Sequence, residues 1–117
     1  MRVFVTGASG WIGSAVVPEL LSHGHEVLGL ARSDVAAEKV AASGAEVLRG
    51  DIQDLDVLRA GAEGADGVVH LAFRHDVAFA GDFDTALASN QAAIEALGEA
   101  LAGTGRPFAI ASGIPVE

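Results

Sequence analysis

Three glycines near the amino terminus stand at a spacing that suits the binding of a pyrophosphate. Gly7, Gly10 and Gly13 directly follow the apolar run Val3 to Val5 and precede a stretch with the apolar spacing of a helix. Glycines between a strand and a helix let the backbone turn tightly, and the free N–H groups of the helix amino terminus favour the negative charge of a phosphate. The alternative is a turn of small residues without a ligand. The place of the glycines in the first strand-helix unit favours phosphate binding.

A family signature is carried by residues 6–13, which read Thr-Gly-Ala-Ser-Gly-Trp-Ile-Gly. This segment resembles the TGxxGxxG motif of the short-chain dehydrogenases, specifically of the NAD(P)-dependent epimerase/dehydratase group. Gly50-Asp51-Ile52 resembles the family's adenine-contacting pair, and His70-Leu71-Ala72 resembles its HxA segment beside the cofactor ribose. The resemblance covers essentially the whole chain and implies a Rossmann fold that binds a dinucleotide. The cofactor-binding residues that it implies are Thr6, Gly7, Ser9, Gly10, Trp11, Ile12, Gly13, Asp51, Ile52, Leu71 and Ala72.

The end of the second predicted strand bears on the choice between NAD and NADP. An acidic residue there would bond the ribose 2′-hydroxyl, whereas a basic residue would meet a 2′-phosphate. The sequence offers Arg32 and Ser33, and no carboxylate appears before Asp34. A guanidinium fork suits a phosphate, so NADP is favoured over NAD. The alternative is a solvated loop arginine, which is common on protein surfaces.

Two polar residues are candidates for the catalytic side of the site. Asn90 falls on the apolar stripe of a long predicted helix, where a buried amide needs hydrogen-bond partners. It resembles the family's Asn that bonds the sheet backbone near the active site, although a merely structural hydrogen bond explains it equally well. Ser112 follows the fifth strand at the position of the family's catalytic Ser or Thr. The Ser-Gly-Ile-Pro spelling departs from typical members, and a plain loop serine near a turn remains the alternative.

The Tyr-x-x-x-Lys pair, the family's general acid/base and its partner, is missing. The chain contains no Tyr, and its single Lys is Lys39, in the second predicted helix. Two functions therefore stay open. The chain is the cofactor half of a reductase, epimerase or dehydratase acting on a sugar nucleotide or a small carbonyl compound, or it is a non-catalytic dinucleotide-binding or redox-sensing module. His70 and His75 match no ligand spacing, so no metal site is predicted.

The elements that must position these residues alternate between strands and helices. Such alternation with short connections predicts right-handed crossovers, a doubly wound parallel sheet in the order 3-2-1-4-5, and helices on both faces. The expected strands are Val3 to Val5, Glu26 to Ala31, Glu46 to Leu48, Gly67 to Leu71 and Phe108 to Ala111. The expected helices run from about Ile12 to His23, from a cap at Ser33 or Asp34 to about Ala42, over one or two turns from Asp54 to Ala62, and from Asp84 to Ala102.

Length and composition limit the class of protein. A chain of 117 residues suits one domain, here a Rossmann domain over residues 1–117 that is expected to end after the fifth strand, without a substrate-binding part. A formal charge of −9 argues against nucleic acid and anionic membranes, and the lack of Cys excludes a disulfide scaffold and a thiolate nucleophile. A soluble, cytoplasmic protein is expected. The long helix or the open sheet edge is expected to support a homo-oligomer.

Overall fold

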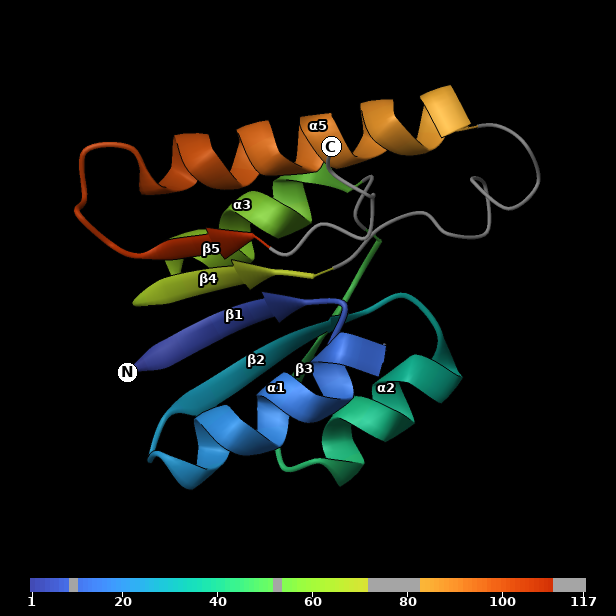
Figure 1. Cartoon of the computed structure of the whole chain (residues 1–117), viewed down its shortest axis with the longest axis vertical. Coiled ribbons are helices and arrows are strands. Elements are labelled where there is room, and N and C mark those ends of the chain that lie inside the picture. The colour runs from blue at the N-terminus through green and yellow to red at the C-terminus, as the bar shows by residue number, and fades with distance from the viewer. Residues whose placement is uncertain (9–10, 52–53, 72–82, 111–117) are drawn as a thin grey trace, which may run out of the picture.

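The chain folds around a parallel sheet of five strands in the order β3-β2-β1-β4-β5 (Figure 1). The computed structural model describes residues 1–8, 11–51, 54–71 and 83–110, with the backbone alone for 11–14, 83–87, 89–90 and 110. The strands are β1 (Arg2–Thr6), β2 (Glu26–Ala31), β3 (Glu46–Arg49), β4 (Gly67–His70) and β5 (Phe108–Ile110). The predicted Rossmann-like fold and strand order are thus confirmed.

Four described helices cover the two faces of this sheet. They are α1 (Trp11–Ser22), α2 (Asp34–Ala42), α3 (Leu55–Glu63) and α5 (Phe83–Leu101). Figure 1 shows α1 and α2 on one face and α3 and α5 on the other. The third helix begins and ends one residue later than the predicted range, and its nine residues make more than two turns.

Alternation along β1 divides the core into two halves. Successive side chains of a strand point to opposite faces. Val3 and Val5 pack on the side of α1 and α2, in a cluster that includes Val17 and Val40. Phe4 points to the other side and packs with residues of α3 and α5, among them Leu58 and Leu97. Because β1 is buried on both faces, its apolar run is continuous.

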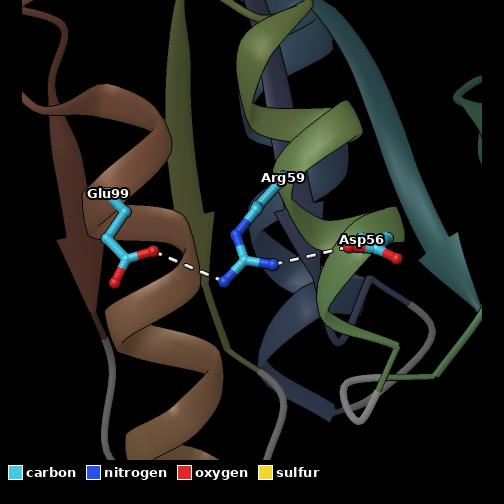
Figure 2. Close-up of polar contacts among 3 residues, drawn as sticks. All are labelled: Asp56, Arg59 and Glu99. Atoms are coloured by element: carbon cyan, nitrogen blue, oxygen red, sulfur yellow. Dashed lines mark hydrogen bonds and ion pairs between the residues drawn. The ribbon is translucent and has the colours of Figure 1, made fainter.

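The outer surface of α3 and α5 carries charged side chains that pair between the two helices. Figure 2 shows Arg59 of α3 between Asp56 and Glu99, with Nη to carboxylate oxygen distances of 3.4 Å to each. Within residues 91–101 of α5 the exposed side chains are Gln91, Glu95 and Glu99. This segment presents no large apolar surface to a second copy, and the homo-oligomer stays a prediction. No described helix is long and apolar enough to span a membrane.

Two caps determine where α2 begins and where α3 ends. The Ser33 hydroxyl accepts a hydrogen bond from the N–H of Ala36 at 3.1 Å, so Ser33 rather than Asp34 is the N-cap of α2. Arg106, just before β5, donates from one Nη to the carbonyl oxygens of Ala62, Glu63 and Ala65 at 2.6–3.2 Å. The Ala62 and Glu63 carbonyls lie in the last turn of α3 and the Ala65 carbonyl lies just beyond it, where a helix leaves its final carbonyls without intrahelical donors.

Candidate functional site

The parallel strands bring the predicted site residues to one edge of the sheet. Strand pairing sets Thr6 of β1 beside His70 of β4, and Ala31 of β2 beside Arg49 of β3. These positions are the carboxyl ends of the four strands. In an open parallel sheet, ligands bind outside the carboxyl ends where the strand order reverses, which here is between β1 and β4.

The turn after β1 has a left-handed backbone conformation at Gly7, which glycine adopts readily. Gly7 has a φ of +70°, in the left-handed region that residues with a Cβ rarely adopt. The chain then reaches α1 at Trp11, so the amino terminus of α1 lies a few residues beyond the carboxyl end of β1. An α-helix amino terminus with its unbonded N–H groups is suited to hold a phosphate.

A buried hydrogen-bond group links the ends of β1 and β4. Thr6 Oγ1 lies 2.7 Å from His70 Nδ1, and both side chains are fully buried. The N–H of Leu71 donates to Thr6 Oγ1 at 3.0 Å and to the Thr6 carbonyl at 3.1 Å. The group therefore fixes how the chain leaves both strands. Sequence reasoning placed these residues in two separate motifs and missed their contact, which depends on the register of β1 with β4.

The ends of β2 and β3 carry four charged side chains. Arg32 Nη1 lies 3.9 Å from Asp51 Oδ2, and Arg49 Nη1 lies 2.9 Å from Asp34 Oδ1. The N–H of Gly50 donates to the Ala31 carbonyl at 3.0 Å, which holds the two strand ends together. Arg32 is 57% exposed and available to a ligand from solvent. Sequence reasoning found Arg32, Ser33 and Asp51 but not Arg49, although Arg49 directly precedes Gly50-Asp51.

For several predicted site residues, the structure describes either no position or the backbone alone. Ser9, Gly10, Ile52, Ala72 and Ser112 are outside the described residues, as is His75. Trp11, Ile12 and Gly13 open α1, and Asn90 lies within α5, but their side chains are not described. Among the residues that are described, no group of three His, Cys, Asp or Glu side chains could hold a metal ion.

Comparison with known proteins identifies the family. The model of the NAD dependent epimerase/dehydratase family matches residues 3–112. The chain belongs to the NAD-dependent epimerase/dehydratase family. An uncharacterised protein of Saccharomyces cerevisiae is 49% identical over 115 residues, which cover 97% of this chain. The chain spans 38% of the length of that relative.

Solved structures of this epimerase/dehydratase type agree with the fold. UDP-glucose-4-epimerase from Stenotrophomonas maltophila, with bound NAD and formylated UDP-arabinopyranose, matches 96% of this chain and 37% of its own, with a TM-score of 0.74 and 26% identity. Yeast methylglyoxal/isovaleraldehyde reductase, complexed with NADPH, matches 62% of this chain and 24% of its own, with a TM-score of 0.52 and 33% identity. The family thus includes proteins with either dinucleotide.

The carboxyl edge of this epimerase/dehydratase-family domain has features that fit such a cofactor. The positive φ of Gly7 lets the chain turn directly from β1 toward α1. Arg32 offers a cation beyond β2. Gly29 of β2 lets Ala8 and Val40 approach the β2 backbone closely, because a Cβ at Gly29 would lie 2.7 Å from Val40 and 2.9 Å from Ala8. The glycine turn after β1 can therefore pack directly against β2.

Proposed function

We propose that the chain binds NADP(H) at the carboxyl edge of its sheet, in preference to NAD(H), as the cofactor half of an oxidoreductase, epimerase or dehydratase. The observation that carries the proposal is the place of Arg32, an exposed guanidinium directly after β2, where a 2′-phosphate would be met. When bound, the dinucleotide supplies the hydride donor or acceptor. The chain's own residues bind and orient it.

The remaining contacts follow from the family signature. Backbone N–H groups of the turn from Gly7 to Gly13 are proposed to hold the pyrophosphate, with Thr6, Ser9, Gly10, Trp11 and Ile12 lining that segment. Asp51 and Ile52 are proposed to contact adenine, and Leu71 and Ala72 to lie beside the ribose. Ser33 accepts from Ala36 N–H, so its hydroxyl hydrogen can still be donated to a phosphate oxygen.

The reaction is proposed from relatives. A UDP-glucose epimerase and a methylglyoxal/isovaleraldehyde reductase are among them, so a sugar nucleotide or a small carbonyl compound is the proposed substrate. Ser112 is proposed to polarise the reacting oxygen, and Asn90 to support the sheet backbone nearby. A cytoplasmic location is proposed with this metabolic function.

A non-catalytic dinucleotide-binding or redox-sensing module is the second candidate. The observation that favours it for these 117 residues is that they contain no Tyr, the residue type of the family's general acid/base. Both candidates require the same cofactor site. They differ in whether the bound dinucleotide exchanges a hydride with a substrate.

The test is a pair of equilibrium titrations, with NADPH and with NADH, on the chain and on Arg32→Gln. The proposal expects NADPH to bind more tightly than NADH, and expects R32Q to weaken NADPH by about tenfold while NADH changes little, because one charged hydrogen-bond partner is lost. Arg59→Gln is the matched control, since it removes the same charge from α3, where Arg59 lies between Asp56 and Glu99 (Figure 2). Unchanged NADPH affinity in R32Q would contradict the proposed NADP site. Oxidation of NADPH by small aldehydes, or conversion of a sugar nucleotide with the dinucleotide bound, assayed separately, would support the enzyme, and neither activity is expected of the module.

A further inference from the structure

The first carboxylate that follows β2 in the sequence is already paired. Asp34 stands in the first turn of α2, two residues beyond Arg32, and its Oδ1 lies 2.9 Å from Arg49 Nη1. Its side chain is 92% exposed. A carboxylate at this place, if unpaired, would repel a ribose 2′-phosphate and accept a hydrogen bond from a ribose 2′-hydroxyl. Whether Asp34 is paired with Arg49 thus bears directly on the choice of dinucleotide.

The backbone holds Arg49 where it can reach Asp34. Arg49 is the last residue of β3 and pairs in register with Ala31, the last residue of β2. Ser33 supplies the N-cap bond of α2, which leaves the Asp34 carboxylate free of that role. The contact therefore arises from two strand ends and one capped helix, and it joins residues 15 apart in sequence.

From this arrangement we infer that Arg49 is a specificity-determining residue that acts through Asp34. By pairing the Asp34 carboxylate, Arg49 removes the negative charge that would otherwise face the 2′ position of the adenosine ribose. The preference for a 2′-phosphorylated dinucleotide then depends on two arginines with different tasks. Arg32 meets the phosphate, and Arg49 neutralises the nearby carboxylate. This inference rests on the proposed NADP site.

Exposed ion pairs contribute little to folding, so variants of this pair are expected to keep the fold. Their effect on a ligand is larger, because a phosphate monoester carries between one and two negative charges near neutral pH. Arg49→Gln is expected to lower the ratio of NADPH to NADH affinity by about tenfold at low salt, where the Debye length exceeds the size of the site. The loss is expected to shrink to about threefold in roughly 0.5 M salt, because exposed charges are then screened.

The experiment is a double-mutant cycle read by equilibrium binding of NADPH and of NADH. It compares the unmodified chain, R49Q, Asp34→Asn and the R49Q/D34N double variant. The inference expects the tenfold loss in R49Q alone, and a ratio within about threefold of the unmodified chain in D34N and in the double variant, since position 34 carries no carboxylate in either. Arg49→Lys is expected to keep the ratio, because an ammonium also neutralises Asp34.

Several results separate the possible failures. An unchanged ratio in R49Q, or a double variant as impaired as R49Q, would overturn the inference, because Arg49 would then not act through Asp34. R59Q carries the same change of net charge on α3 and should leave the ratio unchanged, and an equal loss in R59Q would overturn it as well. If R49Q does not fold, R49K decides, with a tenfold loss counting against the inference. R32Q tests the proposed NADP site itself. If the ratio of NADPH to NADH affinity falls in R32Q but not in R49Q, the role proposed for Arg49 is wrong while the NADP site at Arg32 stands.

Discussion

Gly61 of α3 lies against the ring of Phe4, and replacing it by alanine should destabilise the fold. A Cβ at Gly61 would come within 2.6–2.8 Å of three ring carbons of Phe4. Phe4 is fully buried on β1 and is packed among residues of α3 and α5, so its ring has no free space to move into. Overpacking of this kind costs about 1–3 kcal/mol. Alanine also gains about 1 kcal/mol in helix propensity over glycine. The expected net loss for Gly61→Ala is therefore about 1 kcal/mol.

Gly98 of α5 offers the matched control. It is also a helical glycine, and a Cβ there would meet nothing within 4 Å. Gly98→Ala should thus be stabilised by about 1 kcal/mol from helix propensity alone. The difference between the two variants isolates the overpacking term, about 2 kcal/mol.

Urea unfolding followed by far-UV circular dichroism measures this difference. The slopes of the unfolding free energy with urea should be equal, so that the midpoints report stability directly. A second substitution, Phe4→Leu, should recover part of the loss specifically in the G61A background, because it shortens the ring that the new methyl meets. The reasoning is refuted if G61A is as stable as G98A.

Three further substitutions test the hydrogen bonds that hold the fold. Thr6→Val should lower the unfolding free energy by about 1–3 kcal/mol in urea titrations, because His70 Nδ1 and the Leu71 N–H then lose their hydrogen bond to the buried Thr6 hydroxyl. Thr6→Ser keeps the hydroxyl and should lower the unfolding free energy much less. Arg106→Met should cost about 1–2 kcal/mol in the same assay, since the carbonyls at the end of α3 lose a charged donor; a stability equal to that of the unmodified chain would contradict this role. Ser33→Ala should cost about 1 kcal/mol through the lost N-cap of α2, with Ser33→Asp as the variant that retains it, and a thermal midpoint unmoved in S33A would count against the cap.

The order of the elements was predictable because the sequence alternates apolar runs with helical periodicity. Short connections between each strand and the next helix leave few possible topologies, and the glycine motif identifies β1 as the first strand of a Rossmann unit. The signature residues at the carboxyl edge followed from the same reasoning, since every strand of such a sheet ends at that edge. Ser33 was one of two named cap candidates, and the structure decides between them.

The contacts between distant residues were not predictable. Thr6 and His70 meet because of the register of β1 with β4, which the sequence of neither strand encodes alone. Arg49 and Asp34 belong to no motif in the sequence. Their pairing depends on the ends of β2 and β3 lying side by side. The long helix α5 buries Ala93 and Ala96 as fully as Leu97, so small residues contribute to its buried face.

Isothermal titration of NADPH and NADH into the chain tests the central claim most directly. The account predicts saturable binding of one dinucleotide per chain, with NADPH bound more tightly than NADH at the same salt concentration. Absence of saturable heat for both dinucleotides, in a chain whose circular dichroism shows it to be folded, would contradict the dinucleotide site. Tighter binding of NADH would contradict the role given to Arg32.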